Sequence, residues 1–155
     1  MANGTAPPAT GEELDATARL RVAIGRLARR LQRAASDVPL TATELAVLAT
    51  TARMGPIGLG RLAAEEGMNP TMLSRVVRTL EHAGLLRREG DPDDRRAARV
   101  DPTEDGRRLV DRVRHEKVDA LTRALDRLGE ADRAVLTGAL PVLEALAEAL
   151  RGDRP

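Results

Sequence analysis

Apolar residues recur along most of this sequence at spacings of three and four, which is the period of an amphipathic α-helix. In the first such stretch a capping-box pair, Thr10 and Glu13, predicts the start of a helix. Pro39 predicts that this helix ends near Ser36, because proline disrupts a helix interior. Arginines flank its apolar stripe, which consists of Leu20, Ile24, Leu27 and Leu31.

Two shorter helices are predicted next. A second capping box, Thr41 with Glu44, begins a helix that runs to about residue 53. The following helix covers about residues 58–66 and ends at Gly67, since glycine is favoured just past a helix C-terminus.

The fourth predicted helix has two opposed faces. Asn69 is suited to cap its N-terminus and Pro70 to its first position, and Gly84 follows its end. One stripe is apolar, and a polar stripe repeats the same spacing two residues away, about half a turn around the helix. The apolar stripe is Leu73, Val76, Val77 and Leu80, and the polar stripe is Thr71, Ser74, Arg75 and Arg78.

Two short strands and two long helices complete the pattern. The strands lie at about residues 85–89 and 97–101, around a turn-rich loop. The helices begin at Thr103 and at about residue 131, and the second runs to about residue 151. The fold is therefore predicted to be mainly α, with about six helices and a two- to three-stranded sheet.

Composition narrows the function classes. The chain has no Phe, Tyr or Trp, so its core must form from aliphatic residues and Met. It has no cysteine, which excludes disulfides, thiolate metal sites and cysteine redox sensing. Residues 1–9 are expected to form a disordered tail, without the apolar core of a secretory signal, and no stretch reaches the ~20 apolar residues of a membrane span. We expect a cytoplasmic protein.

The polar stripe of the fourth helix has the chemistry of a DNA-reading surface. It holds two guanidiniums and two hydroxyls without an acid. Arginine can pair with guanine O6 and N7, and hydroxyls can contact base edges and phosphates. With the preceding helix and the turn at Gly67-Met68 it forms a candidate helix-turn-helix. The alternative is an ordinary solvated helix face. The candidate DNA-binding residues are Asn69, Pro70, Thr71, Ser74, Arg75 and Arg78.

The hairpin after this helix has the features of a wing. Arg95 and Arg96 lie near its tip, and a narrow minor groove attracts an inserted arginine. Carboxylates near a DNA-facing tip oppose binding, so we expect Asp91 and Asp94 to pair with arginines and support the wing. The alternative is a charged turn without a role in binding.

Taken together, these motifs resemble the MarR family of winged helix-turn-helix transcription regulators, over roughly residues 19–150. The wing signature, Asp91-Pro92-Asp93-Asp94-Arg95-Arg96, is the most specific part. The other matching segments are Leu40-Thr41, Glu44-Leu45, Leu48, Leu59, Leu62-Ala63, the run 72–81, Gly84-Leu85-Leu86-Arg87-Arg88, and Thr103 with Gly106.

The resemblance implies a homodimer that binds palindromic DNA operators, usually as a repressor and often released by a small ligand. It implies a helical dimerisation region at residues 10–38 and 103–151 and a DNA-binding domain at 40–102. Ser74 and Arg75 match the family's base and phosphate contacts, and Arg95 and Arg96 match its wing arginines.

The sequence departs from the family pattern at two positions. Pro102 stands where a leucine usually precedes Thr103, which puts packing at the root of the wing in doubt. Arg78 stands where an acid is common, and it adds a candidate phosphate contact.

Other kinds of site have little support. His82 and His115 lack neighbouring ligands at metal spacing, and no phosphate loop or catalytic constellation is present, so we expect neither a metal, a cofactor nor an enzyme. A small-ligand pocket between the dimer base and the winged domain is a weaker prediction. Its candidate residues are Arg19, Ala23, Met54, Val110 and Val113.

Two functional hypotheses remain. The first is sequence-specific binding of double-stranded DNA by a homodimer. The second is a helical protein-interaction module that keeps this fold without reading DNA, and it is motivated by the net charge of only +1 and by the acidic wing. Salt-sensitive binding to an operator distinguishes them.

Overall fold

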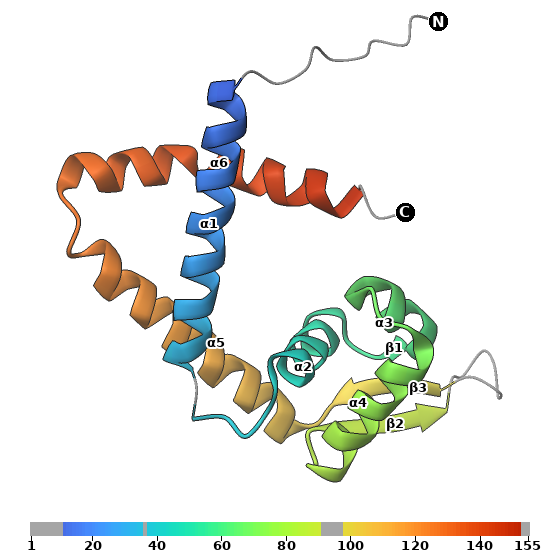
Figure 1. The fold of residues 1–155 in the computed structure, drawn as a ribbon. Helices are drawn as coiled ribbons and strands as arrows, with labels where there is room; N and C mark the ends of the chain where they lie inside the picture. The colour runs from blue at the N-terminus through green and yellow to red at the C-terminus, as the bar shows by residue number, and fades with distance from the viewer. Residues whose placement is uncertain (1–10, 36, 91–97, 153–155) are drawn as a thin grey trace, which may run out of the picture. The chain divides into compact units, whose positions relative to one another are not determined.

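The computed structural model describes residues 11–35, 37–90 and 98–152, and within these ranges it is mainly α-helical, as predicted (Figure 1). The helices are α1 (Gly11–Ala34), α2 (Ala42–Met54), α3 (Leu59–Glu66), α4 (Pro70–His82), α5 (Glu104–Leu125) and α6 (Glu130–Gly152). The strands are β1 (Ile57–Gly58), β2 (Leu86–Gly90) and β3 (Ala98–Pro102). Thr10 and Ser36, at the predicted limits of the first helix, lie outside the described residues. No helix in the described ranges is long and apolar enough to cross a membrane.

The chain divides into two compact units, Met1–Lys117 and Val118–Pro155. This division falls inside α5. The expected boundaries at about residues 40 and 102 separate the DNA-binding domain from the dimerisation region. They concern function and not compactness, and they stay a prediction.

Local hydrogen bonds set the ends of the short helices. The Thr41 hydroxyl oxygen accepts from the Glu44 backbone N–H at 3.2 Å, and Glu44 Oε2 accepts from the Thr41 backbone N–H at 2.7 Å. Asn69 Oδ1 accepts from the Met72 backbone N–H at 2.8 Å and caps α4. Gly67 ends α3 with a φ of 61°, a conformation that glycine adopts without a steric penalty. The predicted caps at Thr41 and Asn69 are confirmed.

We call residues 40–102 the winged part. Its core lies between α2, α3, α4 and the sheet (Figure 1). The apolar stripe predicted on α4 is buried along its length, and Leu73, Val77 and Leu80 are almost fully enclosed. Their partners from the other elements include Val47, Leu48, Leu62, Leu86 and Val100. Because one face of α4 is buried, its opposite face is held toward solvent.

The sheet is antiparallel, with β3 in the centre between β1 and β2. Leu86 pairs with Pro102 and Arg87 with Asp101, while Ile57 pairs with Val100 from the other side. The strand β1 was not predicted by position, because two residues are too few to show an alternating pattern. It nevertheless completes the three-stranded sheet.

Pro102 is accommodated at the root of the wing. Its side chain is fully buried, and the backbone N–H of the next residue, Thr103, donates to the Leu85 carbonyl at 3.0 Å. The Thr103 hydroxyl donates to the Gly84 carbonyl at 2.6 Å, so the start of α5 is bonded to the turn that precedes β2. A side chain at Gly106 would overlap the Leu85 carbonyl, which shows how closely α5 approaches this turn.

A buried carboxylate joins the same three elements. The Asp101 side chain on β3 is only 3% exposed, and its Oδ2 accepts from Arg87 on β2 at 2.6 Å and from Arg107 on α5 at 3.1 Å. We call these three residues the Asp101 cluster. A buried carboxylate without partners would be strongly unfavourable, so the two guanidiniums are needed to keep Asp101 in place.

Substitution of this carboxylate tests its structural role. We expect Asp101→Asn to lower the free energy of unfolding by about 1–3 kcal/mol, because two guanidiniums lose their anion, although both remain about half exposed to water. Urea unfolding followed by circular dichroism measures the change.

Asp105→Asn is the matched control. Asp105 is an exposed acid on the same helix as Arg107, and its hydrogen bond and charge raise the pKa of Arg108. Its loss should leave the urea midpoint almost unchanged, because exposed ion pairs contribute little. Equal midpoints for the Asp101 and Asp105 variants would show that the Asp101 cluster does not stabilise the fold.

Candidate nucleic-acid interface

The outward face of α4 presents the polar stripe. Thr71, Arg75 and Arg78 are exposed, and Ser74 is half-buried. Together with Asn69 and Met72, these four side chains line a hollow in the surface. The sequence-predicted residues of this helix are thus brought together, with Asn69 holding the first turn through its cap and Pro70 exposed beside it.

Arginines and hydroxyls dominate this hollow. Among the described residues no carboxylate lines it, and neither Arg75 nor Arg78 forms an ion pair. Glu81, the acid of α4, lies one turn further along and accepts from Arg88 Nη2 at 3.2 Å. The guanidiniums of Arg75 and Arg78 are therefore available for phosphates or base edges, and the N-terminal end of the helix adds a partial positive charge.

The wing tip lies outside the described residues. Asp91, Asp94, Arg95 and Arg96 fall in the segment 91–97, so the predicted roles of all four stay predictions. The described strands lead directly to this segment, since the ladder continues to the pair Gly90 and Ala98.

Two residues of the winged part were missed by sequence reasoning. Asp101 was not among the residues predicted to support the wing. Among the described residues, it is the acid whose ion pairs join β2 and β3 to α5. The pairing of Asp101 with Arg87 across the two strands could have indicated this ion pair. To use it, however, the register of β2 against β3 had to be known. Met72 was also missed, although it is an apolar residue outside the buried stripe and three positions before Arg75.

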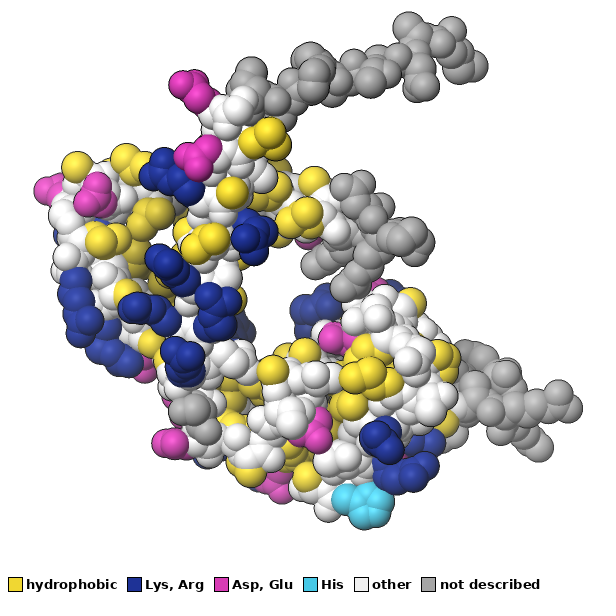
Figure 2. All heavy atoms as spheres, in the orientation of Figure 1, with side chains coloured by type: hydrophobic (Ala, Val, Ile, Leu, Met, Phe, Trp, Pro, Cys, Tyr) yellow, Lys and Arg dark blue, Asp and Glu magenta, His cyan; other side chains and the backbone are white. Residues whose placement is uncertain are grey.

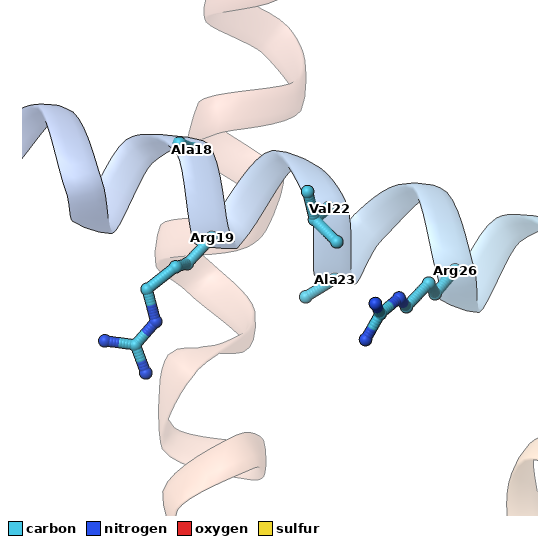
Figure 3. Close-up of a pocket in the computed structure, with 5 residues that line it drawn as sticks. All are labelled: Ala18, Arg19, Val22, Ala23 and Arg26. Atoms are coloured by element: carbon cyan, nitrogen blue, oxygen red, sulfur yellow. The ribbon is translucent and has the colours of Figure 1, made fainter.

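The predicted ligand-pocket residues lie in different surroundings within the chain. Arg19 and Ala23 line a hollow along α1 with Ala18, Val22 and Arg26 (Figure 3). The other three predicted residues take part in packing within the chain, and the prediction of a ligand pocket stays a prediction. Met54 and Val110 pack against the core of the winged part, and Val113 is buried beside Ala35 and Leu45.

The histidines bond within their own helices. His82 Nδ1 lies 2.7 Å from the Arg78 carbonyl oxygen, and His115 Nδ1 lies 2.7 Å from that of Asp111. Across the described part of the chain, no three side chains of metal-ligating type are grouped so that they could hold an ion.

Comparisons with known proteins agree with this geometry. The model of the MarR family matches residues 40–98, which run from just before α2 to the first residue of β3. An HTH-type transcriptional regulator of Mycobacterium tuberculosis is 31% identical over 139 residues, covering 87% of this chain and 97% of that protein. The HTH-type transcriptional regulator PecS of Dickeya dadantii is 32% identical over 120 residues, covering 75% of this chain and 72% of PecS.

Solved structures share the fold over most of the chain. A putative transcriptional regulator from Pseudomonas aeruginosa has a TM-score of 0.80 at 35% identity, covering 90% of this chain and 98% of that one. FabT of Streptococcus pneumoniae, solved in complex with DNA, has a TM-score of 0.69 at 15% identity, with coverages of 90% and 99%, and shows the fold alone. The family model and the relatives at 31–32% identity together establish that the chain belongs to the MarR family of transcriptional regulators.

Proposed function

We propose that this chain is a repressor that binds a palindromic DNA operator as a homodimer. The observation that carries the proposal is the hollow on the outer face of α4, which two guanidiniums and two hydroxyls line without a carboxylate or an ion pair among the described residues. A dimer would place two such helices in successive major grooves about 34–36 Å apart. Family membership supports the dimer and the regulatory role.

The α4 side chains would have distinct tasks. Arg75, central on the exposed face, is suited to pair with a guanine, and Arg78, one turn later, to contact a phosphate. Ser74 and Thr71 supply hydroxyls for base edges or phosphates, while Asn69 and Pro70 set the helix start. Arg95 and Arg96 are proposed to reach the minor groove from the wing.

Operator binding by variants tests these tasks. We expect Arg75→Ala to weaken binding by about 1–3 kcal/mol and to relax the preference at one base pair, because the bidentate pairing with a base is removed. Arg95→Ala or Arg96→Ala should weaken binding evenly across sequences and reduce the salt slope by about one for each phosphate that is no longer neutralised. Selection of duplexes from a random pool, followed by fluorescence anisotropy at several salt concentrations, gives both quantities.

Arg112→Ala serves as the control, because Arg112 lies on α5 away from the polar stripe. Normal binding by all three test variants would contradict the proposed interface. A wild-type chain without salt-sensitive binding to any duplex would instead favour the protein-interaction module.

Exposed apolar side chains support the homodimer. Exposed hydrophobic side chains are visible on the surface outside the winged part (Figure 2). On α1 they include Leu20, Ile24 and Leu27, and on α6 they include a leucine stripe. On α6 the stripe includes Leu136, Leu143 and Leu150, spaced every seven residues, as in helices that pair with other helices. Surfaces of this kind mark protein interfaces.

A charge placed in this stripe should break the dimer. We expect Leu143→Asp to halve the mass measured by light scattering at micromolar concentration, because a buried unpaired carboxylate is strongly unfavourable at an interface. Loss of the dimer should also weaken operator binding. Glu144→Gln, at an exposed neighbouring position, should leave the mass unchanged. If both variants keep the wild-type mass, α6 is not the interface that we propose.

The hollow along α1 supports release by a small ligand. Two guanidiniums, of Arg19 and Arg26, stand beside the small apolar side chains of Ala18, Val22 and Ala23 (Figure 3). The guanidiniums favour a carboxylate, and the small apolar side chains beside them favour an aliphatic chain next to it.

Octanoate is a suitable probe of this ligand class. We expect it to weaken operator binding by the wild-type chain and to have less effect on Arg19→Gln, because the carboxylate loses its cation. Octanol, with the same chain length and no charge, is the control in the same anisotropy titration. An equal effect of octanol and octanoate would count against a charge-recognising site on α1.

A further inference from the structure

Met72 differs from the other apolar side chains of the winged part. Among the described residues between 40 and 102, Met72 is the one large hydrophobic residue that remains exposed, and its exposed fraction is 49%. The other exposed large apolar side chains lie on α1, on α6, at the end of α5 or in the turn after it. Those helices have a proposed partner in the second protomer, whereas Met72 lies on the DNA-facing helix and has none.

The N-terminal cap of α4 fixes the position of Met72. Its backbone N–H is the donor to the Asn69 cap at 2.8 Å, so it belongs to the first turn of α4. Its side chain lines the hollow that contains Arg75 and Arg78. It also lines a neighbouring hollow formed with the first turn of α2 and the turn at Gly67-Met68.

This placement brings Met72 to the part of the helix that approaches bases. Residues in the N-terminal half of a recognition helix contact base edges in the major groove. Met72 precedes Arg75 by three residues, so the two side chains are neighbours on the helix surface. A guanidinium and a flexible thioether are thus presented side by side.

The chemistry of the two side chains is complementary. Arginine reads hydrogen-bond acceptors, whereas methionine has no strong donor or acceptor and gains free energy by removing apolar surface from water. In the major groove the apolar group on a base edge is the C5 methyl of thymine. 5-Methylcytosine carries the same methyl at the same position of its ring.

We propose that Met72 is a specificity-determining residue that packs against the C5 methyl of a pyrimidine next to the base contacted by Arg75. The inference rests on the proposed function, since it requires that the outward face of α4 reads DNA. It adds an apolar contact to a hollow whose other described lining side chains are all polar. The preferred operator therefore has a methylated pyrimidine, ordinarily thymine, at a defined place in each half-site.

Thymidine and deoxyuridine differ only by this methyl group, which gives a direct test. The full chain first selects its tightest duplex from a random-sequence pool, and each thymine of a half-site is then replaced singly by deoxyuridine. At one position we expect the wild-type affinity to fall about fourfold, as for one methyl group returned to water. Cytosine and 5-methylcytosine placed at that position give the second arm, in which the methylated base should bind more tightly.

Variants assign the methyl effect to Met72. Met72→Gln keeps a similar length but is polar, so it should bind thymine and deoxyuridine operators about equally. Met72→Leu is the matched control and should keep most of the discrimination. Because Met72 is half exposed, both variants should unfold at the wild-type temperature, which circular dichroism checks.

The outcomes separate this inference from the function on which it rests. If no sequence is selected, the proposed function fails. If a sequence is selected and its binding depends on Arg75, but no deoxyuridine replacement matters, the operator reading stands and the role of Met72 is overturned. The role is equally overturned if Met72→Gln keeps the full thymine preference, because another side chain then contacts the methyl.

Discussion

Packing of one stripe of α4 against α2, α3 and the sheet is the interaction on which the rest of the winged part depends. Leu73, Val77 and Leu80 are almost fully buried, and this fixes the rotation of the helix about its axis. Arg75 and Arg78 then necessarily lie on the outer side. The exposed polar face is thus a consequence of hydrophobic burial, and the cap at Asn69 fixes where this face begins.

The hairpin is held to this core by a different kind of interaction. Leu86 and Val100 contribute apolar burial, while Asp101 joins Arg87 and Arg107 across two strands and α5. Hydrogen bonds from Thr103 to the turn before β2 fix the same region. Two supports that are close in space therefore orient the strands that lead to the wing tip, and Pro102 is compatible with both.

Exposed apolar surface divides the chain by function. The winged part encloses its large hydrophobic side chains, with Met72 as the exception among the described residues, whereas α1 and α6 expose many of theirs. An exposed apolar stripe along a helix is costly in water, which supports the proposed contact with a second protomer. A single exposed methionine beside two arginines fits a smaller apolar target, and the base methyl that we propose has that size.

The sequence by itself determined the features that depend on neighbours within about one helical turn. Capping at Thr41 and Asn69, the glycine end of α3 and the two faces of α4 follow from hydrogen bonds and periodicity over three or four residues. Only the tertiary structure decided that Asp101 is buried, because its partners lie 14 residues before it and 6 after it in the chain. It likewise decided that Met54, Val110 and Val113 pack in cores, away from the hollow at Arg19. Periodicity shows that a residue faces inward, but which inward-facing residues meet depends on strand register and helix packing.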